Sequence, residues 1–312
     1  MSSRRLVAAA VVALSLAGPC FVAAQPVATA PGVAPTSRRF GGVREDHILN
    51  QLVTARILRR RQVGSTSVNL YLHLDGDVDA AFKPRTQTHP ENYRGEIAAF
   101  RIGRLLSLDR VPPAISRAFP ASALHLSAQT LVTIERDSTV RGAMIYWVPA
   151  LRDSRIDQER ERRRWASWLR QGDRLEPDSA TRAEEISTLI VFDALIGNWD
   201  RWSGQNVPMD ASGHLVYRDH NEAFSEPFGE RMLQGVMRNL RQVQRFSRSV
   251  ITRVRGLSDA SIRAEMSLDP DSVHPPLTNV QIASVLHRRD ALVAYVNELV
   301  HRYGETSVYA FP

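Results

Sequence analysis

The alternation of apolar and polar positions predicts two adjacent strands early in the chain. Residues 68–74, Val-Asn-Leu-Tyr-Leu-His-Leu, alternate strictly and include β-branched and aromatic side chains. Asp75-Gly76-Asp77 supplies a turn, and residues 78–82 continue as a second short strand. We therefore expect a hairpin with Lys83 at the end of its second strand.

Three longer segments carry helical patterns. Residues 95–106 have apolar side chains at helical intervals and are stopped by Val111-Pro112-Pro113. Residues 186–199 are apolar nearly all round, which predicts a buried helix that runs to a Gly-Asn break. A closing helix is expected from Gln281 to Tyr303, before Gly304.

Weaker patterns predict the remaining elements. Residues 48–61, which end in three arginines, are expected to be helical, and residues 130–134 and 143–148 to be the strands of a hairpin. Residues 152–174 are dense in charge and include a predicted helix. Such a run is usually a solvated helix face, and its alternative is a docking site for an acidic protein or glycan.

The first residues have the composition of a signal peptide. Arg4 and Arg5 precede an apolar stretch, and Val22-Ala23-Ala24 resembles a cleavage site, so residues 1–24 are predicted to be removed. The chain's single cysteine, Cys20, leaves with them. Residues 25–44 are expected to be a flexible linker. This pattern predicts a secreted or periplasmic protein that is not inserted in a membrane after cleavage.

The positive charge does not indicate a nucleic-acid partner. The formal net charge is +7, but 33 acidic residues are interleaved with the basic ones. No zinc-ligand spacing, helix-turn-helix pattern or stacking motif accompanies the charge. We therefore expect no nucleic-acid partner.

Among the 40 basic residues of the Lys and Arg types there is one lysine, Lys83. An ammonium is a compact point charge that binds a phosphate oxygen, whereas a guanidinium is broad and planar. Chance survival of one codon would also leave a single lysine. The functional interpretation is that Lys83 contacts the phosphates of a nucleotide. Gly64, Ser65 and Thr66, just before the hairpin, are candidates for a short phosphate-facing turn.

Three carboxylates lie where phosphoryl transfer would need them. Glu96 is expected in the first turn of its helix, where the helix dipole favours it, and it could instead pair with Lys83 or reach a metal. Asp200 follows the buried helix, and Asp219 follows an alternating segment at 214–217 that predicts a short strand. Phosphoryl transfer uses one carboxylate at the acceptor hydroxyl and another at Mg²⁺ or Mn²⁺, which suits Asp200 and Asp219 respectively.

In combination and in order, these segments resemble one family of kinases. The matching pieces are Phe82-Lys83-Pro84, residues 94–100 (Arg-Gly-Glu-Ile-Ala-Ala-Phe), residues 110–113, residues 192–201, and Asp219 before Phe224. They resemble the secretory-pathway kinases typified by the Golgi casein kinase, its xylose-kinase relatives and four-jointed, the family with sequence similarity 20. The resemblance covers the chain from about Lys83 to the C-terminus. The motifs of ordinary protein kinases are missing.

This resemblance implies an α+β, atypical protein-kinase-like fold of two lobes. A small β-rich N-lobe would span residues 45–150 and a mainly helical C-lobe residues 151–312. It further implies that Lys83 binds the ATP phosphates, that Glu96 serves the lysine and the metal, that Asp200 is the catalytic base, and that Asp219 binds Mn²⁺ or Mg²⁺. The chain departs from the family at Trp202-Ser203, where His-His is usual, at Asp219-His220-Asn221, where Asp-Asn-Gly is usual, and in lacking the family's structural cysteines.

A further metal ligand is expected shortly after Asp200. HipA-type and phosphoinositide kinases place a metal-binding Asn there, which favours Asn206, although Gln205 competes with it. Either amide could instead bond its own loop backbone.

Together the patterns predict an exported kinase that transfers the γ-phosphoryl group of ATP, with Mn²⁺ or Mg²⁺, to a hydroxyl of a protein or glycan. Two alternatives remain open: a pseudokinase that binds nucleotide without turnover, and a nucleotidyl transferase on a kinase-like fold.

Overall fold

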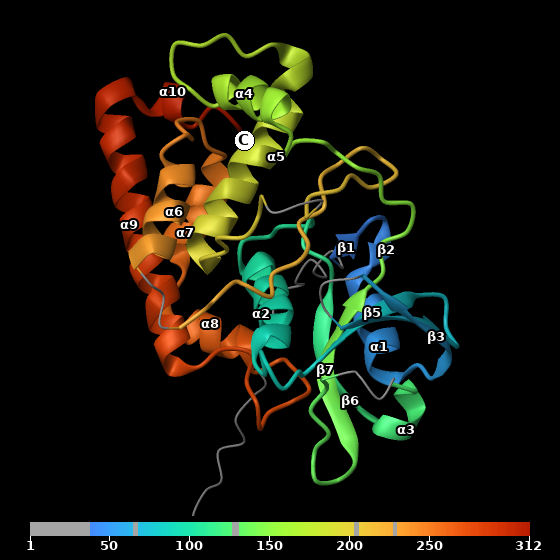
Figure 1. Cartoon of the computed structure of the whole chain (residues 1–312). Helices are drawn as coiled ribbons and strands as arrows, with labels where there is room; N and C mark the ends of the chain where they lie inside the picture. Colours follow the sequence, from blue (N-terminus) through green and yellow to red (C-terminus); the bar gives the residue numbers. More distant parts are fainter. Residues whose placement is uncertain (1–37, 65–67, 127–130, 203–205, 227–229) are drawn as a thin grey trace, which may run out of the picture. The chain divides into compact units, whose positions relative to one another are not determined.

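A five-stranded antiparallel sheet forms one side of the molecule (Figure 1). The computed structural model describes residues 38–64, 68–126, 131–202, 206–226 and 230–312. The predicted signal peptide and residues 25–37 of the predicted linker lie outside this range. The strands of the sheet follow the order β3-β4-β5-β7-β6. Their bounds are β3 Ile57–Val63, β4 Asn69–Leu74, β5 Asp79–Pro84, β6 Ala114–Pro120 and β7 Thr139–Tyr146. A separate small ribbon joins β1 (Arg39–Phe40) and β2 (Val43–Arg44).

The predicted hairpin is confirmed as β4 and β5. Leu70, Leu72 and Leu74 are buried on one face, and the residues between them lie on the other. The same alternation holds in β5, where Phe82 is buried and Lys83 lies on the opposite face. Lys83 pairs with Ala143 of β7 in the middle of the sheet.

Three of the weaker predictions are wrong. The expected helix at residues 48–61 ends early: α1 spans Glu45–Thr54, and residues 57–63 become β3 because they pair with β4. β7 pairs with β5 and β6 rather than with residues 130–134, of which Val132 makes an isolated bridge to Thr86. Residues 214–217 form no strand, and Leu215 makes a single bridge to Met209. In the first two cases pairing with neighbouring strands decided the structure.

Helices make up the other side of the described chain, shown from yellow to red in Figure 1. The remaining helices are α2 Asn92–Leu105, α3 Ala121–Leu124, α4 Glu159–Trp168, α5 Pro177–Ile196, α6 Glu230–Leu240, α7 Arg248–Gly256, α8 Asp259–Met266, α9 Asn279–Tyr303 and α10 Glu305–Val308. The closing helix α9 agrees with its prediction.

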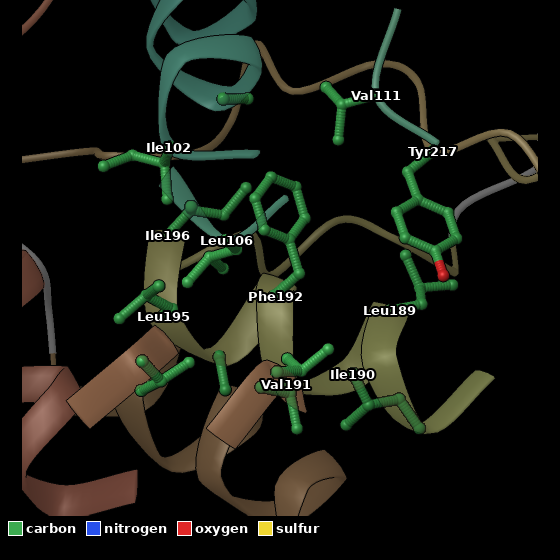
Figure 2. Close-up of a cluster of buried hydrophobic side chains, with 14 of the residues drawn as sticks. Ile102, Leu106, Val111, Leu189, Ile190, Val191, Phe192, Leu195, Ile196 and Tyr217 are labelled. Carbon is green, nitrogen blue, oxygen red and sulfur yellow. The ribbon is translucent and has the colours of Figure 1, made fainter. Parts of the chain in front are cut away.

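Helix α5 is the buried helix that the apolar run predicted. Pro177 starts it, because a proline fits the first turn where its missing N–H is not needed. It ends at Gly197, whose φ of 71° is a left-handed cap that favours glycine. In Figure 2, Phe192 and Ile196 of α5 pack against Ile102 of α2 and Leu106, which follows it. This contact places α2 firmly against the helices.

Two hydrophobic cores underlie the two sides. One core lies on the buried face of the sheet and includes Leu72, Phe82 and Met144. The other lies among the helices and takes in Ile97 and Phe100 of α2. Helix α2 contacts β6 and β7 on one side and α5 and α8 on the other. The α+β, two-lobed kinase-like fold is confirmed, while the boundary at residue 150 stays a prediction.

Candidate active site

Lys83 binds two carboxylates at once. Its Nζ donates a short hydrogen bond to Glu96 Oε1 and a second, of 2.6 Å, to Asp219 Oδ1. The three residues come from β5, from α2 and from the loop after residue 217. The structure thus brings together three of the residues that the sequence singled out.

Glu96 accepts three hydrogen bonds. Besides Lys83, the His220 main-chain N–H donates to Oε1 at 3.0 Å, and the His220 ring Nδ1 lies 3.2 Å from Oε2. An ionised carboxylate has about four acceptor positions, so about one remains for a further partner. Helix α2 begins at Asn92, so Glu96 is not in the first turn, and that expectation is wrong. Its position is therefore better explained by these three donors than by the helix dipole.

Two carboxylates share the single ammonium of this cluster. Burial raises the pKa of Glu96, but the charge of Lys83 and the hydrogen bond from His220 outweigh it, and the net pKa is lowered. Burial lowers the pKa of Lys83, but Glu96 and Asp219 together raise it above its ordinary value. Burial lowers the pKa of His220. Near neutral pH the site therefore holds an ammonium, ionised Glu96 and a neutral imidazole.

A glycine allows the Asp219 loop to approach α2. A Cβ added at Gly95 would lie 2.3 Å from the carbonyl oxygen of His220, closer than any real contact. Asp219 itself has a φ of 63°, a left-handed conformation that is uncommon outside glycine and tolerated best by Asp and Asn. Tyr217, just before it, is buried and donates from its hydroxyl to the carbonyl of Glu185 on α5 at 2.7 Å. The loop is thus fixed on both sides of Asp219.

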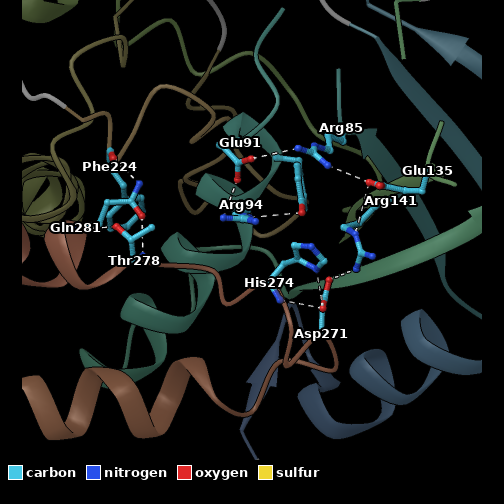
Figure 3. Close-up of polar contacts among 11 residues, drawn as sticks. Arg85, Glu91, Arg94, Glu135, Arg141, Phe224, Asp271, His274, Thr278 and Gln281 are labelled. Atoms are coloured by element: carbon cyan, nitrogen blue, oxygen red, sulfur yellow. Dashed lines mark hydrogen bonds and ion pairs between the residues drawn. The ribbon is translucent and has the colours of Figure 1, made fainter. Parts of the chain in front are cut away.

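An ion-pair network holds the strand of Lys83 beside the helix of Glu96. Arg85 on the strand side lies 3.7 Å from Glu91, and Glu91 is 2.6 Å from Arg94 on α2 (Figure 3). Arg85 also bonds Glu135 at 3.0 Å. The network extends through Arg141 of β7. These contacts flank the site and restrict relative movement of β5 and α2.

The Lys83 cluster lines a cavity of about 360 Å³. Trp147 and Val148, just after β7, contribute an apolar wall, and Trp147 packs edge-on against Tyr71 with ring centres 4.9 Å apart. A larger hollow of about 590 Å³ along β3 is lined by none of the candidate residues, so its size has no bearing on the chemistry.

A buried ion pair that the sequence analysis missed supports the loop of Asp200. Arg201 is 1% exposed and donates two hydrogen bonds to Asp193 of α5, at 2.8 and 2.9 Å. Its remaining nitrogen bonds the main-chain carbonyl of Arg218, next to Asp219. Burial lowers the pKa of Arg201, but Asp193 raises it overall. A carboxylate inside an otherwise apolar helix needs a buried partner, and that signal could have identified Asp193.

The other candidates lie at the edge of the site or outside the described residues. Asp200 is half-buried after α5, and Asn206 donates from its side chain to the Asp200 carbonyl at 3.5 Å. Neither lines the cavity. Ser65, Thr66, Ser203 and Gln205 lie outside the described residues, although the neighbouring Gly64 does line the cavity. The roles of all these residues stay predictions.

The donors around the cavity suit a hard cation. Within the described ranges, no group of three or more His, Cys, Asp or Glu side chains could enclose a metal. Asp219 and Glu96 offer carboxylate oxygens, and Asp219 is 41% exposed toward the cavity side. Mg²⁺ is commonly bound by one or two carboxylates together with substrate phosphates and water. The residues therefore fit a cation that arrives with a nucleotide.

In sequence, the chain is similar to glycosaminoglycan xylosylkinases. No family model matches the chain. Glycosaminoglycan xylosylkinase from Homo sapiens is 22% identical over 317 residues, covering 84% of this chain and 76% of the relative. The Danio rerio glycosaminoglycan xylosylkinase is 23% identical over 315 residues, covering 82% and 75%.

In structure, the chain is similar to solved kinases of the same family. The structure of hydra Fam20 with sugar has a TM-score of 0.61 at 18% identity, covering 84% of this chain and 90% of that one. The Golgi casein kinase has a TM-score of 0.63 at 17% identity, with coverage of 85% and 78%. Its structure with Mn and ADP bound gives 0.61 at 16% identity, again with 85% and 78%. The fold is that of the Fam20-type kinases, and the predicted resemblance to that family is confirmed.

In the described part of the chain, no helix combines the length and the apolar character that crossing a membrane requires.

Proposed function

We propose that this chain is a metal-dependent kinase that transfers the γ-phosphoryl group of ATP to a hydroxyl. The observation that carries the proposal is the cluster of Lys83, Glu96 and Asp219 on one cavity wall, within a Fam20-type fold. Kinases use a lysine paired with a helix glutamate at the phosphates, together with an aspartate that holds the metal ion, and the metal neutralises the developing charge.

Each residue then has a distinct task. The ammonium of Lys83 binds phosphate oxygens, and Glu96 holds that ammonium in place. Asp219 and Glu96 would hold Mn²⁺ or Mg²⁺, which neutralises charge on the phosphates. Asp200 takes the proton from the acceptor hydroxyl. The hydroxyl oxygen bonds the γ-phosphorus, and the bond from that phosphorus to the oxygen that leaves with ADP breaks. Asn206, Ser65 and Thr66 are secondary candidates for contacts to metal or phosphate.

The acceptor is a protein or a glycan. A glycan acceptor is suggested by the similarity to glycosaminoglycan xylosylkinase, and a protein acceptor by the similarity to the Golgi casein kinase. We propose that the chain acts outside the cytoplasm, because residues 1–24 have the pattern of a cleavable signal peptide.

Radiolabelled ATP tests the proposal. Purified protein is incubated with Mn²⁺ and either γ- or α-labelled ATP, and with dephosphorylated casein or a xylose-containing disaccharide. We expect label from the γ position in one acceptor and none from the α position. Transfer from the α position would indicate a nucleotidyl transferase, and nucleotide binding without any transfer would indicate a pseudokinase.

A further inference from the structure

His220 is, with Arg201, one of the two most deeply buried polar residues that the candidate site brings together. Its side chain is 1% exposed and contacts Glu96. Ring Nδ1 is 3.2 Å from Glu96 Oε2, and the main-chain N–H donates to Oε1 of the same carboxylate at 3.0 Å. The same residue therefore contacts both oxygens of Glu96.

The contact with Glu96 determines which ring nitrogen of His220 carries a proton. Ionised Glu96 can only accept hydrogen bonds, so Nδ1 must carry the proton. Nε2 is buried without a hydrogen-bond partner among the described residues. The ring meets Phe192 edge to face, with centres 5.7 Å apart.

We propose that His220 is a positioning residue, whose Nδ1–H fixes the orientation of Glu96 and thereby holds Lys83 Nζ between Glu96 and Asp219. A carboxylate at the end of a glutamate side chain can rotate about its last bond, and a donor on Oε2 removes that freedom. Oε1 then faces Lys83, and Nζ remains within 2.6 Å of Asp219. Outer contacts of this kind commonly change the affinity or activity of a site by about 10- to 100-fold.

The expected effect of His220 on ADP binding rests on the proposed function, whereas the hydrogen bond between His220 and Glu96 does not. A packing role would require only a side chain of similar volume. A positioning role requires a donor at the place of Nδ1. His220→Asn can supply an amide N–H there, whereas His220→Leu keeps an apolar side chain and supplies none.

The first measurement is independent of catalysis. Nitrogen-15 NMR of the histidine rings, with assignment of His220 by its loss in His220→Asn, reports which ring nitrogen is protonated. We expect a proton on Nδ1 of His220. A ring protonated on Nε2 alone would overturn the proposal.

The second measurement compares the two variants by calorimetry with ADP and Mn²⁺ and by thermal unfolding. His220→Leu should weaken ADP binding about tenfold or more, and His220→Asn should stay within about threefold of the wild type. Equal affinities in the two variants would mean that His220 only packs. If the wild type shows the Nδ1–H form but binds no ADP, the proposed function fails while the positioning of Glu96 stands.

Discussion

Lys83 and Asp219 are 136 positions apart in the chain and share a hydrogen-bonded ion pair of 2.6 Å. Lys83 reaches this place on a central strand, and Asp219 reaches it on a loop that presses against α2 at Gly95. Asp219 adopts a left-handed backbone conformation there. Such strain in a non-glycine residue persists where surrounding contacts fix it, and it is concentrated at functional sites.

Gly95→Ala tests the close approach of this loop. The new methyl group would meet the His220 carbonyl at 2.3 Å, so the loop must shift. We expect a loss of about 1–3 kcal/mol in the free energy of unfolding, and weaker ADP binding because Asp219 moves. Gly235→Ala in α6 is the matched control, since its Cβ meets no atom nearer than 3.9 Å. The control should be neutral or stabilising, because alanine favours helices. Equal effects in the two variants would contradict the close packing.

Asp193→Asn tests the buried ion pair beneath the Asp200 loop. The substitution leaves Arg201 without its carboxylate in a buried position, and we expect a loss of about 3–5 kcal/mol by denaturant unfolding. Glu298→Gln breaks an exposed pair with Arg302 and should cost less than about 1 kcal/mol. If Asp193→Asn lowers the free energy of unfolding by no more than this control, the ion pair of Arg201 with Asp193 does not stabilise the fold.

The two aspartates should separate binding from turnover. Asp219→Asn removes the carboxylate proposed for the metal and should greatly weaken ADP binding in the presence of Mn²⁺. Asp200→Asn should leave ADP affinity within about threefold and lower the rate of transfer by about 10²–10⁴, the usual range for a general base. Parallel calorimetry and initial rates check this. Similar losses of affinity in both variants would show that the assignment of the two roles is wrong.

Asp271 should contribute to stability in a pH-dependent way. Burial raises the pKa of its carboxyl, but hydrogen bonds from His274 and the charge of Arg141 outweigh this and lower it. Its contribution is therefore present above the unfolded value near 3.8 and is lost as the pH falls through the lower folded value.

The Asp271→Asn variant should accordingly unfold with less dependence on acid below about pH 4. Asp290→Asn, at an exposed position, is the control for loss of one carboxylate. Thermal unfolding between pH 3 and pH 7 measures both. An identical pH profile for wild type and Asp271→Asn would refute the contribution.

The sequence pattern predicted β4, β5 and α5, which hold the site, better than it predicted β3 and β6. The alternation in β4 and β5 and the apolar run of α5 are strong because each is decided mostly by burial. Residues 57–63 were misjudged because the burial pattern of β3 repeats every three residues rather than every two, and the strand exists through pairing with β4. The β6 strand was missed because its buried and exposed positions do not alternate.

The site residues divide in a similar way. Lys83 and Asp219 stood out by residue type and by resemblance, and their meeting is visible only in three dimensions. His220 and Arg201 were passed over, because their contribution is a set of hydrogen bonds to Glu96, Asp193 and the loop backbone. Spacing along the sequence does not encode such bonds.

Calorimetry of ADP binding with Mn²⁺ tests the central claim most directly, by comparing wild type with two changes at Lys83. Lys83→Arg keeps the charge but replaces the compact ammonium with a broad guanidinium, and we expect about tenfold weaker binding or more. The double variant Lys83→Met/Glu96→Gln removes the buried charge pair together, which limits the loss of stability from an unpaired carboxylate. It should fold, as circular dichroism can verify, and bind ADP at least about 100-fold more weakly than wild type. Unchanged affinity in both variants would show that the Lys83 cluster is not a nucleotide site and would contradict the kinase assignment.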